Sequence, residues 1–478
     1  MIDLLRRWGQ GSNSFQILEK GFSHWFAGPP DEPDAMIGYV LVGDCRVVAG
    51  IPVCAPERLP HFIAVFVEAG LTQGFRTVFV GVESQFMPAF AAAGIPHDAI
   101  KLGEQPEWSP ADYSLEPSAR KSLRAQVNRA RNKGVRVRRV EPEDIVRAPG
   151  SLRSEIEHIL ARWLGSRRMG TLRFMVDLEP FTHPAHRRYY VAEQGDRSVG
   201  FLAAVPIFVR EGWFFEDVIR VPDAPNGTVE LLIHTAMEDA REAGDQFVTL
   251  GLSPLRGIMD EAGPHPRTRK CLEFFGSRLG FLYDFQGLES FKNRFRPDHW
   301  CTQYAVAAPG PTGLKTARAI MGAFVPGGFP SFIAQSMRRL LARISAKRWA
   351  SILQLLAVLL VPWTILLSLV DGVHWFGDVS IQKAWVAFDV AMTLGLMGLS
   401  RLVAMARPSG RRFSMFLAGA TIADFVLSLF QALHLHRSVT GLTALVVVMG
   451  VSGPLVATAV LISIAMVAPT KEITSSGV

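Results

Sequence analysis

Hydrophobic and polar positions divide the chain into two parts of different character. Residues 1–348 mix charged, apolar, glycine and proline positions, whereas residues 349–468 are apolar almost throughout. A helix needs about 20 apolar residues to cross the hydrocarbon core of a bilayer. Four stretches satisfy this requirement, at residues 350–370, 384–405, 413–433 and 441–467. The pattern therefore predicts a mixed soluble part followed by a bundle of four transmembrane helices.

Strand and helix patterns alternate in the first soluble stretch, residues 36–135. Runs of β-branched residues predict strands, and apolar positions three and four apart predict helices. The expected elements are a strand pair at 36–42 and 45–51, a helix at 60–70, a strand at 77–82 and a helix at 85–93. The order is β-β-α-β-α.

The second soluble stretch, residues 135–308, repeats this order more fully. The expected strands are 135–140, 188–193, 199–209, 213–221 and 247–252, and the expected helices are 152–164, 228–243 and 270–278. Thr228 is a suitable N-cap for the helix that follows it. This order predicts an α/β fold with a mixed sheet and helices on both faces. It resembles the GNAT acyltransferase fold, and the first stretch resembles a degenerate copy of it.

These patterns divide the chain into five segments. We expect a degenerate GNAT-like domain, a GNAT-like catalytic domain, a linker with a basic amphipathic helix at the membrane surface, the four spans and a short tail. The corresponding residues are 1–134, 135–308, 309–348, 349–468 and 469–478.

Charges flanking the spans predict their orientation, because cytoplasmic loops carry an excess of Lys and Arg. Basic residues precede the first span and fill the loop between the second and third: Arg338, Arg339, Arg343, Lys347, Arg348, Arg401, Arg407, Arg411 and Arg412. The opposite loops contain only Lys383 and Arg437. Residues 1–11 lack the apolar core of a secretory signal. We therefore expect both termini and the soluble domains on the cytoplasmic side.

Two acidic residues, Asp389 and Asp424, lie inside predicted spans. A carboxylate in hydrocarbon is costly and usually faces a partner or a wet cavity. One interpretation is a polar helix-packing contact or a protonated acid. The other is a site for a lipid headgroup or a proton between the second and third spans.

Net charge and cysteine content limit the function classes. The formal net charge of +7 favours anionic partners such as nucleic acid, anionic lipid or a phosphate-bearing substrate. Cys45, Cys54, Cys271 and Cys301 form no C-x-x-C pair and have no zinc-ligand spacing. We expect reduced thiols and no metal site.

Five segments in the same order carry a resemblance to a known family. They are RWLGSRRMGTLRFM (162–175), VGFLAAVP (199–206), WFFEDVIRVPDAPNGTVELLI (213–233), LGLSPL (250–255) and LESFKNRFRPDHWCTQY (288–304). Weaker similarity extends to residues 43–46 and 118–134. Together they resemble the catalytic domain of the phosphatidylglycerol lysyltransferases, also called multiple peptide resistance factors, a family linked to antimicrobial peptide resistance.

The resemblance implies a tandem GNAT-like fold and a membrane-bound aminoacyltransferase. The family moves an aminoacyl group from aminoacyl-tRNA to the glycerol headgroup of phosphatidylglycerol. Such members carry a long membrane flippase segment before the catalytic domain, whereas the spans of this chain follow it. The expected location is the bacterial inner membrane, with aminoacyl-tRNA as co-substrate and no other cofactor. The amino acid, the exact lipid acceptor and the oligomeric state stay open.

Residues 213–233, a strand, turn and helix, supply the best catalytic candidates. Asp217 and Arg220 stand near the end of the strand, where a bulge is needed to bring them to one face. Asp217 is suited to orient or deprotonate the acceptor, and Arg220 to hold a phosphate; a structural ion pair is the alternative. Glu230 is a second candidate for a catalytic acid. Alternatively, its charge near the helix N-terminus stabilises the helix dipole.

The turn before this predicted helix is a candidate phosphate site. Backbone N–H groups at a helix start favour an anion, and this start is formed by Asn226, Gly227 and Thr228. GNAT folds generally bind the pyrophosphate of coenzyme A here through a glycine-rich loop. The single glycine disfavours coenzyme A and leaves a lipid phosphate or the tRNA 3′ end.

Two basic clusters are candidate polyanion sites. The first cluster comprises Lys292, Arg294, Arg296 and Trp300, where basic residues alternate with aromatic ones. Such a mixture suits the stacking of nucleic-acid bases. The alternative interpretation is a solvated strand face. Residues 118–139 carry nine basic residues and no acid, and the candidates there are Arg120, Lys121, Arg124, Arg129 and Arg131. Such a run indicates tRNA or the anionic leaflet.

Three functions remain open from sequence. The first is an aminoacyl-tRNA-dependent lipid aminoacyltransferase. The second is a GNAT-type acyltransferase that uses acyl-coenzyme A or acyl carrier protein at the membrane. The third is a membrane-tethered binding module without catalysis, which the presence of Asp217, Arg220 and the 226–228 turn disfavours.

Overall fold

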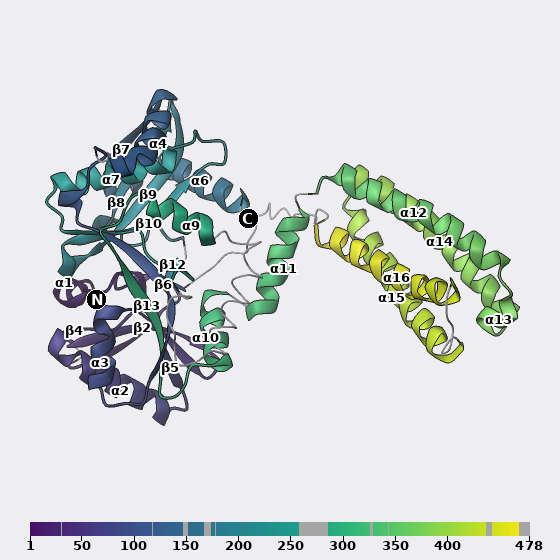
Figure 1. Ribbon diagram of the computed structural model, residues 1–478, viewed down its shortest axis with the longest axis horizontal. Helices are drawn as coiled ribbons and strands as arrows, with labels where there is room; N and C mark the ends of the chain where they lie inside the picture. Colours follow the sequence, from purple (N-terminus) through teal and green to yellow (C-terminus); the bar gives the residue numbers. More distant parts are fainter. Residues whose placement is uncertain are drawn as a thin grey trace, which may run out of the picture. The chain divides into compact units, whose positions relative to one another are not determined.

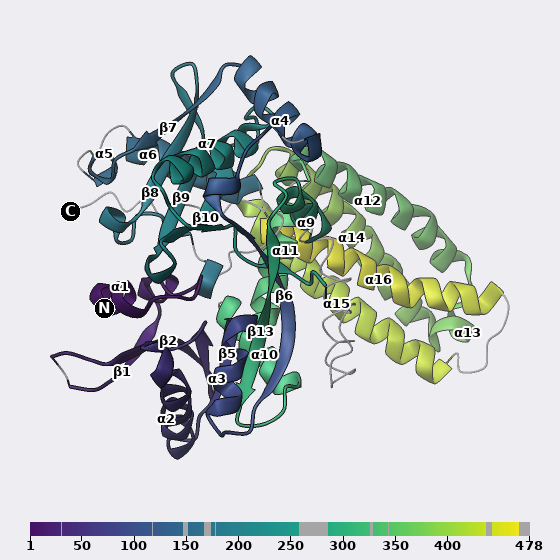
Figure 2. The same cartoon turned by 60° about the vertical axis from the view of Figure 1, so that its left-hand side comes forward.

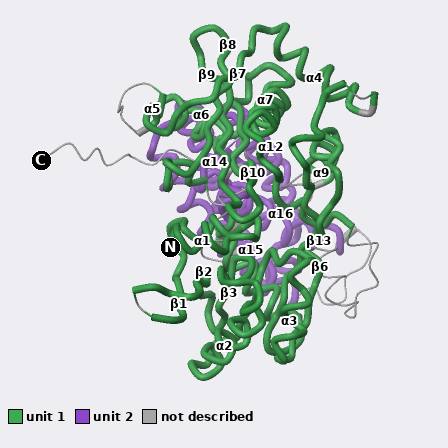
Figure 3. Tube along the Cα trace, turned by 90° about the vertical axis from the view of Figure 1, so that its left-hand side faces the viewer, with its two compact units in different colours: residues 1–333 green, residues 334–478 purple. Residues whose placement is uncertain are grey.

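A computed structural model describes most of the chain as two compact units, Met1–Ile333 and Ala334–Val478 (Figures 1 and 3). The described residues are 1–29, 31–116, 118–146, 152–166, 174–176, 178–257, 285–325, 328–342, 344–435 and 442–467. The predicted helix at 270–278 and Cys271 lie outside them.

One continuous sheet runs through the first unit (Figure 2). Its order is β1-β2-β3-β5-β13-β6-β11-β10-β9-β8-β7, with β4 on β2 and β12 on β6. The strands are β1 (Ser23–Ala27), β2 (Ala35–Val42), β3 (Cys45–Ala49), β4 (Val53–Cys54), β5 (Arg76–Glu83), β6 (Asp98–Trp108), β7 (Val135–Val140), β8 (Arg188–Gln194), β9 (Arg197–Ile207), β10 (Gly212–Arg220), β11 (Phe247–Thr249), β12 (Ser253–Pro254) and β13 (His299–Ala308).

The sheet contains two copies of one structural unit. In the first, β1, β2 and β3 form an antiparallel meander, helix α2 (Leu59–Thr72) follows, and β5 pairs parallel to β3. In the second, β8, β9 and β10 form the meander, helix α7 (Thr228–Glu242) follows, and β11 pairs parallel to β10. The predicted mixed α/β sheet and its repeat are therefore confirmed.

The two copies exchange their last strands. Strand β13, which follows the second copy in sequence, lies between β5 and β6 and pairs antiparallel with both. Strand β6, the last of the first copy, continues the sheet to β11. The exchange puts residues 299–308 into the first half of the sheet, although the sequence groups them with the second.

Helices cover the sheet and bury its apolar side chains. Around the first copy, Phe62 and Phe66 of α2 pack on Phe79 and Phe90, with ring contacts between them. Around the second copy, Leu232, Ile233 and Met237 of α7 pack on Tyr189 and Phe201. The described part of this unit also contains the helices α1 (Ile2–Trp8), α3 (Met87–Ala92), α4 (Lys121–Asn132), α5 (Pro142–Val146), α6 (Leu152–Ser166), α9 (Phe285–Asn293) and α10 (Leu314–Phe324).

Among its described residues, the second unit contains four helices that are long and apolar enough to cross a membrane, as predicted. They are α12 (Ala346–Leu369), α14 (Val379–Ala404), α15 (Ser409–Leu435) and α16 (Leu442–Val467), with the short α13 (Gly372–Phe376) after α12. The amphipathic helix predicted within the linker 309–348 is divided at its end: α11 (Gly328–Leu341) ends before Ser345, whose hydroxyl caps α12. Lys347 and Arg348 therefore belong to the first turn of α12.

Candidate active site

Asp217 is buried in strand β10 and does not meet Arg220. A bulge separates Phe215 from Asp217 in the pairing with β9, but the strand alternates regularly from Asp217 to Arg220. The bulge therefore leaves the two side chains on opposite faces. The Arg220 guanidinium instead donates to the carbonyl oxygens of Ala224 at 3.0 Å and Val221 at 3.5 Å. Arg220 thus holds the turn that leads into α7.

A buried cluster of charged side chains surrounds Asp217. The Arg187 side chain is entirely buried, donates to Oε2 of Glu216 at 2.6 Å, and lies 3.6 Å from Oε1 of Glu19. Asp217 interacts electrostatically with both Arg187 and Glu19. Gln16 donates to Oε1 of Glu216 at 2.9 Å, which binds the N-terminal segment to β10. The cluster joins residues from three distant parts of the chain.

Burial sets the protonation of this cluster. Desolvation, reinforced by the neighbouring Glu216, raises the pKa of Glu19 to about 10. Glu19 is therefore protonated at neutral pH, where Arg187 faces the carboxylates of Glu216 and Asp217.

The N-terminus of α7 is closed by α4. Gly227 is the N-cap residue with φ of 93°, so the cap is one residue earlier than the predicted Thr228. Thr228 is fully buried and donates to the Pro225 carbonyl at 2.7 Å. A Cβ on Gly227 would lie 2.0 Å from the Gln126 carbonyl of α4. Of the predicted phosphate-binding turn, Asn226 alone is exposed, so a phosphate seated at Gly227 and Thr228 would have to displace α4.

Two predicted site residues form an ion pair with each other. Arg294, in the turn after α9, donates to Oε1 of Glu230 in the first turn of α7. The Glu230 side chain is mostly buried, whereas that of Arg294 is about one third exposed. The pair fastens α9 to α7, which accounts for both residues structurally.

The remaining members of the predicted 292–300 basic cluster are dispersed. Lys292 is buried and donates to the carbonyls of Gly251 at 2.8 Å and Leu252 at 2.9 Å. Desolvation lowers the pKa of Lys292 to about 7. Arg296 is exposed, and the Trp300 ring is covered by the Arg256 guanidinium at 3.9 Å. The expectation of one surface for base stacking is therefore wrong: Lys292 clamps the loop after β11, and Trp300 already has a partner.

The basic run at 118–139 separates into structural and exposed residues. Arg120 is buried and donates to the carbonyls of Ser114, Phe295 and Arg296, at 2.7, 3.2 and 3.2 Å. Arg124 donates to the Leu115 carbonyl at 2.6 Å. These two arginines secure neighbouring chain segments, contrary to the prediction that they bind a polyanion. Three of the predicted residues stay exposed on α4, namely Lys121, Arg129 and Arg131. Lys133, directly after α4, and Arg136 on β7 are exposed as well.

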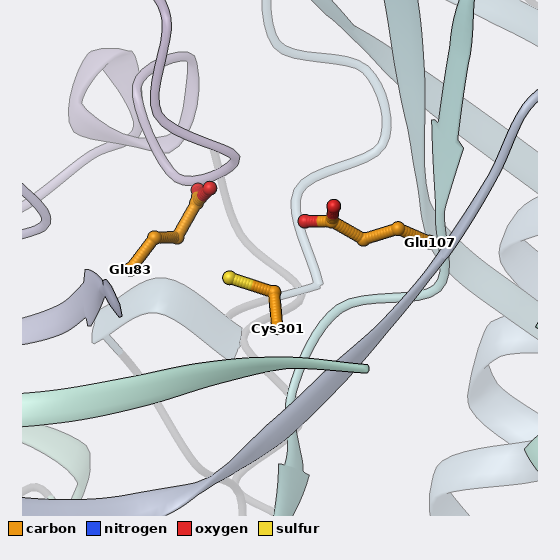
Figure 4. A group of neighbouring side chains, drawn as sticks. All are labelled: Glu83, Glu107 and Cys301. Atoms are coloured by element: carbon orange, nitrogen blue, oxygen red, sulfur yellow. The ribbon is translucent and has the colours of Figure 1, made fainter. Parts of the chain in front are cut away.

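A second buried cluster lies where the two halves of the sheet meet (Figure 4). Glu83, Glu107 and Cys301 each offer a ligand atom, and these atoms lie within 4.8 Å of one another. Arg210 spans both carboxylates, at 3.1 Å from Glu83 and 3.2 Å from Glu107. His299 lies 2.7 Å from Glu107. The three ligand atoms suit a divalent cation, but the Arg210 guanidinium already supplies the positive charge that such a cation would bring to the two carboxylates.

Sequence reasoning missed both buried clusters because their members are far apart along the chain. Glu19, Arg187 and Glu216, like Glu83, Arg210 and Cys301, meet only through strand pairing and the N-terminal segment. No local motif carries such a signal.

The described cysteines Cys45, Cys54 and Cys301 are free and buried, and burial raises their thiol pKa values to about 11, 12 and 11.

Comparison with known proteins covers the first unit. The family model described as phosphatidylglycerol lysyltransferase, C-terminal, matches residues 2–307. The lysylphosphatidylglycerol biosynthesis bifunctional protein LysX of Nocardia farcinica is 28% identical over 284 residues, which are 58% of this chain and 24% of that protein. The phosphatidylglycerol lysyltransferase of Bacillus subtilis is 24% identical over 57% of this chain and 31% of its own length. The chain thus spans about a third or less of these relatives.

Two solved structures share the fold. The C-terminal domain of a protein from Agrobacterium fabrum, described as a lysylphosphatidylglycerol synthetase, has a TM-score of 0.57 and 23% identity, with 69% of this chain and 97% of that chain covered. L-PGS from Bacillus licheniformis has a TM-score of 0.54 and 21% identity, with 65% and 90% covered. At these identities the two structures establish the fold of the first unit.

Proposed function

The chain belongs to the phosphatidylglycerol lysyltransferase C-terminal family, and from this premise we propose that it transfers an aminoacyl group from aminoacyl-tRNA to phosphatidylglycerol. The observation that carries the proposal is the family match across residues 2–307, nearly the whole first unit. Relatives named for lysylphosphatidylglycerol biosynthesis in Nocardia and for phosphatidylglycerol lysyl transfer in Bacillus match the same part of the chain.

The reaction exchanges one ester for another. A hydroxyl of the lipid glycerol attacks the aminoacyl carbonyl carbon and loses its proton. The bond from that carbon to the tRNA 3′ terminal ribose oxygen breaks, and this oxygen takes up a proton. Orientation, a proton acceptor and stabilisation of the developing oxyanion are what the protein must supply.

Asp217 is our choice for the proton acceptor. It lies on β10, next to the Arg187–Glu216 ion pair, and its carboxyl group is buried. The fully buried Arg187 holds the cluster in a fixed geometry, which favours a positioned base over a mobile one.

The closed N-terminus of α7 favours an ester donor over coenzyme A. A pyrophosphate in the manner of GNAT folds would occupy the space at Gly227, which the Gln126 carbonyl of α4 already fills. An aminoacyl ester needs no such site. The exposed basic residues of α4 and β7, from Lys121 to Arg136, then provide a surface for the tRNA phosphates.

We also propose that the four apolar helices cross the bacterial inner membrane with the first unit in the cytoplasm. The charges around Arg348 and Arg411 support this orientation, and both substrates are accessible there. Cysteine labelling from either side of intact cells tests it, with single cysteines introduced at Ser409 and Gly377. We expect Gly377→Cys to react from outside and Ser409→Cys only after the cells are opened.

A transfer assay tests the function. Membranes that contain the protein are mixed with lysyl- or alanyl-tRNA labelled in the amino acid, and lipid-soluble label is counted. We expect label in phosphatidylglycerol, lost after ribonuclease treatment and absent from membranes without the protein. Label from acyl-coenzyme A and none from any aminoacyl-tRNA would contradict the proposal.

A further inference from the structure

The N-terminal segment at residues 12–19 is buried throughout and is fastened at its start to the first copy of the structural unit. The backbone N–H of Ser12 donates to Oε1 of Glu83 at 2.7 Å. The side-chain amide of Asn13 donates to the carbonyl of Gly81 at 3.3 Å. Glu83 and Gly81 both belong to β5, so the start of the segment is fixed to the first half of the sheet.

Gln16 joins this segment to two other parts of the chain. Its buried side-chain amide donates to the Met175 carbonyl at 2.7 Å and to Oε1 of Glu216 at 2.9 Å. Both hydrogens of the amide nitrogen are therefore used. The Oε1 oxygen of Gln16 itself is buried without a hydrogen-bond partner among the described residues. Since such an oxygen is costly to bury, the side chain is placed for its two donated bonds.

Glu216 is the extra residue of the bulge in β10. In the pairing with β9, Phe215 lies opposite Ala204 and Asp217 lies opposite Ala203, so Glu216 has no partner residue on β9. A bulge bends its strand and changes the direction of the side chains beside it. The direction of the Asp217 side chain therefore depends on how the bulge is held.

Two donors hold the carboxylate of Glu216, one at each oxygen. Gln16 donates to Oε1, and Arg187 donates to Oε2 at 2.6 Å. The Glu216 side chain is only 6% exposed, so water does not replace either donor. A single donor leaves a carboxylate free to turn about its bond to the chain, whereas a donor at each oxygen prevents this rotation. Gln16 and Arg187 together therefore give the bulge one orientation.

We propose that Gln16 is a positioning residue for the transfer reaction, because it holds the bulge at Glu216 and thereby keeps Asp217 directed at the acceptor hydroxyl. This inference rests on the proposed function, in which Asp217 accepts the proton of that hydroxyl. Gln16 acts through Glu216 and needs no contact with substrate. Misplacing a reacting group by about 1 Å can cost a factor of about 100 in rate. Loss of Gln16 should therefore slow the reaction and leave substrate binding unchanged.

Transfer kinetics separate positioning from a general loss of stability. Gln16→Met keeps the size of the side chain and removes both donated bonds, whereas Asn13→Ala, the matched control, removes a bond of the same segment to the first half of the sheet. Both variants are assayed at a temperature where circular dichroism shows them folded. We expect Gln16→Met to lower kcat at least tenfold and to change KM for aminoacyl-tRNA and phosphatidylglycerol less than twofold. Asn13→Ala should keep kcat within twofold. Equal losses of kcat in the two variants, or a loss confined to KM, overturns the proposal.

Combination with Asp217→Asn tests whether Gln16 acts through the base. Once the base is absent its direction no longer matters, so Gln16→Met should lower the residual rate of Asp217→Asn less than twofold. A purely structural role predicts the same tenfold loss in both backgrounds, because independent effects add in free energy. That result would contradict the proposal.

Hydrogen exchange tests the positioning without the transfer reaction. Amide exchange of β10 is followed by mass spectrometry in the full-length wild-type protein, Gln16→Met and Asn13→Ala. We expect exchange in β10 to rise at least tenfold in Gln16→Met and to stay unchanged in Asn13→Ala. Unchanged exchange in Gln16→Met overturns the proposal even where activity falls.

Two further outcomes are distinguishable. If Gln16→Met fails to fold, Gln16→Asn decides by the same measurements, because its amide is one methylene shorter and cannot reach both acceptors. Absence of transfer by the wild-type protein contradicts the proposed function, whereas the exchange result still decides whether Gln16 holds β10.

Discussion

The buried guanidinium of Arg187 donates a 2.6 Å hydrogen bond to Glu216, the residue directly before Asp217 on β10. Arg187 precedes β8 and Glu216 lies on β10, so the bond reaches across the intervening strand β9. It fixes the segment of β10 that carries Asp217. The geometry of our candidate base therefore depends on an ion pair that no local sequence pattern reveals.

Removing Arg187 should destabilise the first unit strongly. Arg187→Met leaves Glu216 buried without its cation, and breaking a buried pair from one side costs about 3–5 kcal/mol of unfolding free energy. Urea unfolding followed by tryptophan fluorescence measures it. The double variant Arg187→Met, Glu216→Leu should recover a large part of the loss. Equal stability of the single variant and the wild-type protein would show that the pair is not a structural anchor.

Stability should fall with rising pH because of Glu19. Its pKa is about 10 in the folded protein and 4.5 as an ordinary side chain. Between these values the folded state binds a proton that the unfolded state has lost, so the stabilisation is complete below about pH 4.5 and decreases up to about pH 10. Glu19→Gln cannot lose this proton. We expect the variant to gain stability relative to wild type between pH 6 and pH 9, and a constant difference over that range would contradict the assignment.

Gly227 should be intolerant of any side chain. Gly227→Ala places a Cβ 2.0 Å from the Gln126 carbonyl at φ of 93°, so α4 must move away from α7. Gly244→Ala is the matched control, because Gly244 has φ of 75° and open space around its Cβ position. The control carries only the backbone strain of about 1 kcal/mol. Thermal unfolding should show a clearly larger loss for Gly227→Ala, and equal losses would mean that α4 does not press on this turn.

The exposed basic residues should contribute to tRNA affinity, and the buried ones to stability. Replacing Lys121, Arg129 and Arg131 together by Gln should weaken tRNA binding and reduce the slope of log K against log salt by about two to three. Fluorescence anisotropy with labelled tRNA measures both quantities. Arg120→Gln should instead lower the unfolding temperature, since Arg120 holds three carbonyl groups. An unchanged salt slope in the triple variant would place the tRNA elsewhere.

Strands with regular apolar patterns could be predicted from the sequence. The structure contains the predicted strand pair at 36–42 and 45–51 and the predicted meander from 188 to 221. In these segments apolar residues either alternate with polar ones or follow each other without interruption, as positions in a sheet require. Strands β6 and β13 were not predicted. Strand β6 buries the polar residues Lys101, Gln105 and Glu107. A buried strand is recognised in a sequence by apolar residues at its inward positions, and β6 has polar residues there. The exchange of these two strands is a tertiary event without a sequence signal.

The candidate site was predictable only in part. Asp217 and its neighbour Glu216 stand in a segment that carries the family resemblance, whereas Glu19 and Arg187 are brought to it by folding. Charge patterns likewise identified the basic run but not the partners of its members. Arg120 and Arg124 face carbonyl groups of nearby loops, and neighbours such as Lys121 and Arg131 remain exposed.

The most direct test of the account is the lipid composition of cells that carry Asp217→Asn. Lipid extracts are compared by mass spectrometry between cells with the wild-type protein, the variant, and Asp196→Asn, an exposed acid in the β8–β9 turn. We predict aminoacylated phosphatidylglycerol with the wild-type protein and Asp196→Asn, and at least a hundredfold less with Asp217→Asn at equal protein level. Undiminished product in the Asp217→Asn cells, or none in the wild-type cells, would contradict the account.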